Sequence, residues 1–243
     1  MKKMIQTGSH QLYTAIILLL LVFPKISNAQ VSEEEYRLLK SLDSTSHCNC
    51  PAAAFAKLYL ESTTQALIQF ENSDSVEKHF IQRMEMRFAS LFFKAATSVL
   101  QHEPVHGSWS AYYAGTNLSF TQYQLLGINA HINGDIWQAL VAEFNLNELR
   151  AFRQGYTRFN KGLAWVYRRF YYATTGAMFK LLLLDRLTVG LSKIYGTNRL
   201  IKWREREMNL AILYYEDPSV FEMKKQKSDR KMKQINRMIL QVL

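Results

Sequence analysis

The chain is poor in the residues that make tight turns and cross-links. Its 243 residues include only 10 glycines, 4 prolines and 2 cysteines. So few turn-forming residues argue against an all-β fold, which needs many tight turns. The sequence also lacks a Gly-rich phosphate loop and a Gly-x-Ser-x-Gly element, so nucleotide-dependent and serine-esterase chemistry have no local support.

The two cysteines, Cys48 and Cys50, are separated by a single residue. Cysteines this close rarely form an unstrained disulfide, because disulfide geometry fixes the separation of the two Cα atoms. Three alternatives remain: a local disulfide, a link to another molecule, or two ligands of a metal. One neighbouring histidine, His47, does not supply the second ligand pair of a structural zinc site, so a local role is favoured.

The N-terminal residues have the pattern of a signal peptide. Lys2 and Lys3 precede the unbroken apolar run Ala15–Phe23, and small residues follow at Ser27 and Ala29. The apolar run is shorter than the ~20 residues that a membrane-spanning helix needs. We therefore expect cleavage after Ala29 and an exported protein, either periplasmic or secreted. An uncleaved membrane anchor is the alternative.

Most of the remaining chain has the apolar spacing of α-helices. Phe80, Met84, Phe88 and Phe92, for example, recur on one side of a helix. With 48% hydrophobic and 13% aromatic residues, the chain can build a folded core. The predicted helices span residues 32–43, 51–71, 75–101, 121–144, 147–173, 176–195, 198–216 and 219–242. We predict an all-α, irregular multi-helix bundle with one domain at 51–243, preceded by a signal peptide at 1–29 and an N-terminal extension at 30–50.

Four polar residues stand out in the apolar helix predicted at 121–144. They are Asn129, His131, Asn133 and Asp135. His131 and Asp135 are four residues apart, hence on one side of a helix and one turn from each other. The pair could hold a divalent metal such as zinc, or Asp135 could orient His131 as a general base. The alternative is a hydrogen-bond network that only joins helices. Asn129 projects to another side and is expected to fix a neighbouring helix or the long irregular stretch at 102–120.

The stretch Leu126–Asp135 resembles the signature of an uncharacterised helical family, a domain of unknown function marked by Asn-Ala-His-Ile-Asn-x-Asp. Arg87-Phe88 and Trp109 match an Arg-Phe pair and a tryptophan that this family has ahead of the motif. The resemblance covers roughly residues 52–215 and implies a helical fold without a named reaction. We take His131 and Asp135 as candidate catalytic and metal-ligating residues, and Asn129, Asn133, Arg87, Trp109 and Tyr123 as candidate binding residues.

Positive charge gathers at the C-terminal end. The formal net charge is +10, and loss of residues 1–29 would leave +7. Residues 224–237 contain seven Lys and Arg residues and one acid, Asp229. This segment could contact an anionic envelope surface, although a solvated helix face is the simpler interpretation. Nucleic acid is not expected as a partner of an exported protein. The charged stretch 203–207 is predicted to be a surface ion-pair ladder.

The sequence supports two functions about equally. One is a hydrolase-like enzyme that uses His131 and Asp135, with or without a divalent metal. The other is a non-catalytic exported protein that binds a small apolar ligand or an envelope partner, with the motif as a structural polar network.

Overall fold

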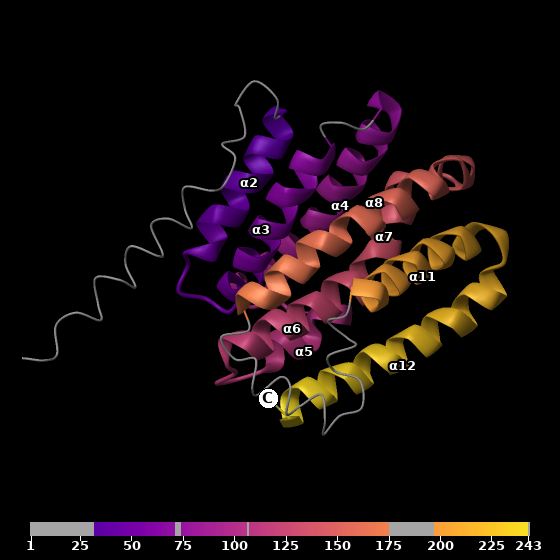
Figure 1. The fold of residues 1–243 in the computed structure, drawn as a ribbon. Coiled ribbons are helices and arrows are strands. Elements are labelled where there is room, and N and C mark those ends of the chain that lie inside the picture. Colours follow the sequence, from indigo (N-terminus) through magenta and orange to yellow (C-terminus); the bar gives the residue numbers. More distant parts are fainter. Residues whose placement is uncertain (1–31, 71–73, 106, 175–196, 243) are drawn as a thin grey trace, which may run out of the picture. The chain divides into compact units, whose positions relative to one another are not determined.

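The computed structural model describes residues 32–70, 74–105, 107–174 and 197–242. The predicted signal peptide and the helix predicted at 176–195 lie outside the described residues. The described residues are helical almost throughout, which confirms the predicted all-α bundle (Figure 1). The elements are α2 (Glu33–Ser46), α3 (Ala52–Phe70), α4 (Ser75–Leu100), η1 (Gly107–Trp109), α5 (Ser110–Ala114), α6 (Phe120–Ala130), η2 (His131–Asp135), α7 (Ile136–Glu143), α8 (Leu146–Thr174), α11 (Thr197–Glu216) and α12 (Pro218–Val242).

Local sequence signals fix several helix ends. The Asp74 side chain accepts hydrogen bonds from the backbone N–H groups of Val76 and Glu77 at the start of α4. Ser119 and Gln122 form a reciprocal capping box at the start of α6. These caps satisfy backbone donors that have no partner inside the helix. Helix α4 therefore matches its prediction to within one residue at each end.

Helix α2 packs against α3 and belongs to the same compact unit, which begins at Glu33. Leu38 and Leu42 of α2 are buried in the common core. The stretch 30–50, expected as an extension ahead of the helical domain, thus contributes a core helix. Between α2 and α3, Cys48 and Cys50 form a local disulfide with their Cα atoms 5.3 Å apart.

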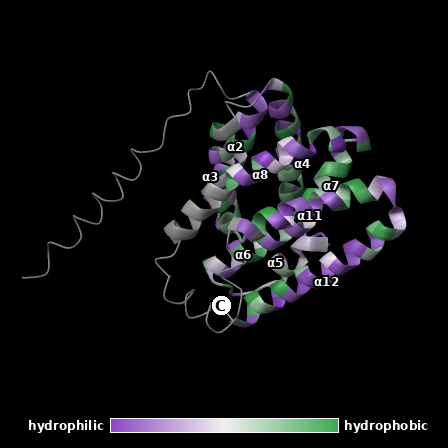
Figure 2. Cartoon of the chain, turned by 45° about the vertical axis from the view of Figure 1, so that its right-hand side comes forward, coloured by the Kyte–Doolittle hydropathy of each residue, from purple (hydrophilic) through white to green (hydrophobic). Residues whose placement is uncertain are grey.

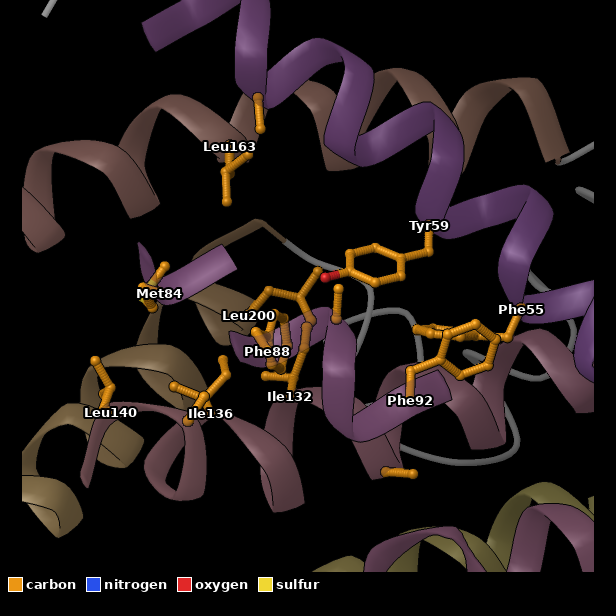
Figure 3. Close-up of a cluster of buried hydrophobic side chains, with 14 of the residues drawn as sticks. Phe55, Tyr59, Met84, Phe88, Phe92, Ile132, Ile136, Leu140, Leu163 and Leu200 are labelled. Atoms are coloured by element: carbon orange, nitrogen blue, oxygen red, sulfur yellow. The ribbon is translucent and has the colours of Figure 1, made fainter. Parts of the chain in front are cut away.

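The consecutive elements α6, η2 and α7 run through the middle of the bundle. They contact α3, α4, α11 and α12, while α8 packs against α3 and α11 (Figure 1). Large apolar side chains fill the space between these helices, and Figure 3 shows some of them. Each such side chain contributes roughly 1.5–3 kcal/mol by its removal from water. Among the described helices, none combines the length and apolar character needed to span a bilayer.

Candidate functional site

The motif predicted to carry function lies where the central helix changes its winding. Its second half, His131–Asp135, forms the single π-helical turn η2, and all five residues are buried. A π turn redirects side chains relative to a regular α-helix and is frequent at functional sites. The polar side chains divide between two sides: His131 and Asp135 contact η1 and α4, whereas Asn129 and Asn133 contact α12 and α11.

His131 and Asp135 are directly hydrogen-bonded. Nδ1 of His131 lies 2.9 Å from Oδ2 of Asp135, and both side chains are 3% exposed. Since the carboxylate is an acceptor, the network assigns the imidazole proton to Nδ1, which donates to Asp135. The other ring nitrogen, Nε2, is then an acceptor with an available lone pair. This hydrogen bond is compatible both with an Asp135 that orients His131 as a general base and with a network that only joins helices.

Asp135 is held by two further donors from the stretch after α4. The Ser108 hydroxyl donates to Oδ1 at 3.0 Å, and Nε1–H of Trp109 donates to Oδ2 at 2.7 Å. The close approach of Ser108 depends on Gly134, where a Cβ atom would lie only 2.1 Å from the Ser108 Cβ. The long irregular stretch of the sequence therefore folds over the motif and fixes the carboxylate that orients His131.

Aromatic rings enclose the imidazole of His131. The Phe88 ring stacks on it with centroids 3.4 Å apart and an interplanar angle of 12°, and Tyr59 contacts it edge-on at 4.6 Å. Burial lowers the pKa of His131, and the nearby Arg204 charge acts in the same direction, although Asp135 opposes both. The imidazole is therefore uncharged at neutral pH.

His131 lines a cavity of about 50 Å³ between α3, α4, α11 and the motif helix. A water molecule needs roughly 10–15 Å³ by this measure, so the cavity has room for a few waters or a short organic group. Within the described residues, the buried atoms Nε2 of His131 and Oγ1 of Thr63 have no hydrogen-bond partner. The rest of the wall is mainly apolar. It includes Leu58 and, labelled in Figure 3, Phe55, Tyr59, Phe88, Ile132 and Leu200.

A buried ion pair also lines the cavity. Nη2 of Arg204 lies 3.3 Å from Oε1 of Glu85, and Nε of Arg204 donates to Oδ1 of Asn160 at 2.6 Å. Burial raises the pKa of Glu85 even though the guanidinium of Arg204 lowers it. The cavity thus brings together two titratable groups, His131 and Glu85, whose surroundings disfavour their charged forms.

The opposite side of the motif joins three helices. Nδ2 of Asn129 donates to Oδ1 of Asn236 at 2.7 Å and to the backbone carbonyl of Met232 at 3.0 Å, both on α12. Nδ2 of Asn133 donates to Oδ1 of Asn129, and Nη2 of Arg206 on α11 donates to Oδ1 of Asn133, both at 2.7 Å. The two asparagines therefore fix neighbouring helices, and their side chains do not line the cavity.

Three further candidates from the sequence have different surroundings. Trp109 contacts the motif by the hydrogen bond that its Nε1–H donates to Asp135. Arg87 is exposed on α4, while its neighbour Phe88 stacks on His131. Tyr123 is half-buried and donates its hydroxyl to the carbonyl of Gly115 at 3.1 Å. The structure thus brings Trp109 to the pair and leaves Arg87 and Tyr123 outside the cavity wall.

Joint metal binding by His131 and Asp135 would require other contacts to break, because Asp135 already accepts from Ser108, Trp109 and His131. Among the described residues, no group of three or more His, Cys, Asp and Glu side chains is arranged to hold a metal ion. Nε2 of His131 is buried and has no hydrogen-bond partner among these residues.

The prediction of a surface ion-pair ladder at residues 203–207 is wrong. Arg204 is 2% exposed and Glu207 is fully buried, and Arg204 lines the cavity. Both residues share a helix side with Leu200 and Met208, which are also buried. This apolar spacing was the available signal, but the density of charge in the segment obscured it.

The fold and the site together define an all-helical protein with a buried His–Asp pair beside a small cavity. The chain belongs to a family of unknown function, DUF5995, whose model matches residues 35–242. This span includes α12 and most of α2, and so exceeds the range over which the sequence motif suggested a family. Searches of curated proteins and of solved structures found no significant match.

Proposed function

We propose that this protein binds a small, mainly apolar molecule through one hydrogen bond to His131. The observation that carries the proposal is the buried Nε2 atom of His131, which has no partner among the described residues and belongs to a side chain that lines a largely apolar cavity. A buried acceptor without a partner costs about 1–3 kcal/mol, so a hydroxyl or N–H group that reaches it is favoured over an apolar one. The cavity volume suits a short alcohol, or the polar end of a longer molecule, better than a large ring system.

Two isomeric probes test this proposal. 1-Butanol and methyl propyl ether have the same atoms, but only the alcohol can donate a hydrogen bond. Titrations followed by the ¹⁵N resonances of His131 should show saturable binding of the alcohol, about tenfold tighter than that of the ether. Equal affinities, or no saturable binding of either probe, would refute a role of Nε2 as ligand acceptor.

The variant His131→Asn provides the matched control. The Asn amide can still donate to Asp135 in place of Nδ1–H, but it has no atom equivalent to Nε2. We expect the variant to remain folded and to lose the preference for the alcohol over the ether. A preference that persists in this variant would assign the ligand to another group.

A second candidate function is acid–base catalysis on the bound molecule. The specific observation that favours it is the presence of Glu85 and His131 on one cavity wall, with the Glu85 pKa raised and the His131 pKa lowered. Such a pair can supply a proton donor and a proton acceptor at the same pH. His131 would then act as general base towards a water molecule in the cavity, which is the hydrolase-like function expected from the motif.

Hydrolysis of p-nitrophenyl butyrate by wild-type protein, His131→Asn and Glu85→Gln tests this candidate. Loss of the base should reduce the rate by roughly 10²-fold or more. Elemental analysis of wild-type protein and His131→Asn for zinc would separate a metal-assisted reaction from a metal-free one. Rates that are equal in all three proteins would refute the catalytic function and leave the binding function intact.

We also propose that residues 1–29 direct export of the chain, on the basis of their basic, apolar and small-residue segments. Expression in a bacterial host followed by N-terminal sequencing of the periplasmic or secreted protein should give Gln30 as the first residue. A chain that retains Met1 and stays with the cells would contradict this proposal.

A further inference from the structure

The outward side of α12 carries a row of positively charged residues. Lys227, Arg230 and Lys231 follow at spacings of three and four residues, and Arg237 lies two turns after Arg230. These spacings keep all four on one side of the helix, and all four are exposed. Figure 2 shows hydrophilic residues recurring along this helix. We refer to these four residues as the basic strip.

The carboxylates of α12 do not neutralise the basic strip. Asp229 pairs with Lys225 at 2.7 Å, and Glu222 precedes Lys227 by more than one helical turn. In the described part of the chain, none of the four cations has an ion-pair partner. Among the described residues, the strip is therefore not neutralised by ion pairs and is exposed to solvent.

The apolar side of α12 is already used by the protein. Met232 and Ile239 are buried against the bundle, and Asn236 is hydrogen-bonded to Asn129 of the motif helix. The helix is thus held with its basic side outward and cannot turn its apolar side to a partner. Lys227, Arg230 and Lys231, together with Met223 and Gln234, line an open hollow on the surface.

We infer that the basic strip of α12 binds the anionic headgroups of a lipid bilayer. The four residues extend over about 15 Å of a straight helix, which suits a planar array of negative charges. The only aromatic residue of α12, Phe221, is buried, so the strip offers no ring on which nucleic-acid bases could stack. Binding of this kind is electrostatic and should weaken steeply as salt is added.

Co-sedimentation of the full chain with lipid vesicles tests this inference. We expect the wild-type protein to bind vesicles of phosphatidylglycerol and phosphatidylcholine at low salt, and not vesicles of phosphatidylcholine alone. The triple variant Lys227→Gln, Arg230→Gln, Lys231→Gln should bind about 100-fold more weakly, because each cation near the surface contributes a several-fold gain. Circular dichroism would verify that the variant remains helical.

A second triple variant distinguishes the effect of the basic strip from the effect of net charge. Lys94→Gln, Lys161→Gln and Lys202→Gln remove three exposed cations from α4, α8 and α11, and leave the same net charge as the first variant. We expect this control to bind like the wild-type protein. Equal weakening of both variants, no binding by the wild-type protein, or tighter binding to duplex DNA than to anionic vesicles would each overturn the inference.

Discussion

At the scale of single residues, the two ring nitrogens of His131 have different surroundings. Nδ1 is hydrogen-bonded to Asp135, which Ser108 and Trp109 hold in place, whereas Nε2 is buried and has no partner among the described residues. Asp135 thereby decides both the tautomer of the ring and its orientation. Any binding or proton transfer by His131 depends on this carboxylate, although the carboxylate itself does not reach the cavity wall.

Two substitutions at Asp135 separate its charge from its hydrogen bonds. Asp135→Asn can keep an oxygen towards Trp109 and His131 and turn its amide towards the Ser108 hydroxyl, so we expect a loss of only about 1 kcal/mol in unfolding free energy. Asp135→Ala leaves three buried donors without an acceptor and should cost roughly 3 kcal/mol or more. Denaturant unfolding measures both changes, and equal losses would show that charge outweighs the bonds.

At the scale of elements, the π turn and one glycine bring two segments together. Gly134 lets η1 approach η2 closely enough for Ser108 to reach Asp135. Gly155 on α8 also lies close to another side chain, but its neighbour there is the Glu77 carboxylate, at the end of a flexible side chain. The two glycines therefore offer a comparison between a rigid and a yielding contact.

We expect Gly134→Ala to destabilise the protein by roughly 1–3 kcal/mol, because the new methyl group would overlap the Ser108 Cβ. Gly155→Ala should be neutral or stabilise by up to about 1 kcal/mol, since alanine favours the helix and Glu77 can move. Thermal unfolding of both variants provides the measurement. A Gly134→Ala protein as stable as wild type would mean that η1 is free to shift away from η2.

At the scale of the whole molecule, buried titratable groups link stability to pH. The buried carboxyl of Glu207 on α11 is one such group, because burial raises its pKa to about 8 despite the adjacent Arg206. The folded protein therefore holds a proton that the unfolded chain releases near pH 4.5, so Glu207 lowers stability as pH rises from 4.5 to 8. Below pH 6.5, His131 has the opposite effect on stability. Its pKa is lower in the folded protein than in the unfolded chain, so the unfolded chain binds more protons and stability rises with pH in this range.

Above pH 6.5 the effect of Glu207 should dominate that of His131. We expect the unfolding free energy to fall by about 2 kcal/mol between pH 6.5 and 8, and most of this slope to disappear in Glu207→Gln, which imitates the protonated form. Exposed Glu222→Gln on α12 is the control and should keep the slope. Denaturant unfolding across this pH range measures the effect. If the unfolding free energy of Glu207→Gln fell as much as that of the wild-type protein, Glu207 would not be the source of the pH dependence.

The sequence by itself determined the helical class, most helix boundaries and the choice of His131 and Asp135. These follow from interactions between residues near each other in the chain: apolar spacing, caps such as Asp74, and a four-residue separation that places two side chains together. The π turn at 131–135 escaped prediction, because apolar spacing does not reveal one additional residue in a turn.

Only the tertiary structure decided what surrounds the pair. Ser108 and Trp109 meet Asp135 across 27 and 26 residues, and Arg204 and Glu85 meet across 119, so no local pattern predicts these contacts. Packing also buried Arg204 and Glu207, against the expectation of a surface ion-pair ladder, and left Arg87 exposed. The physical reason is that the cost of burying a polar group depends on its partners, and those partners arrive only when the distant helices come together.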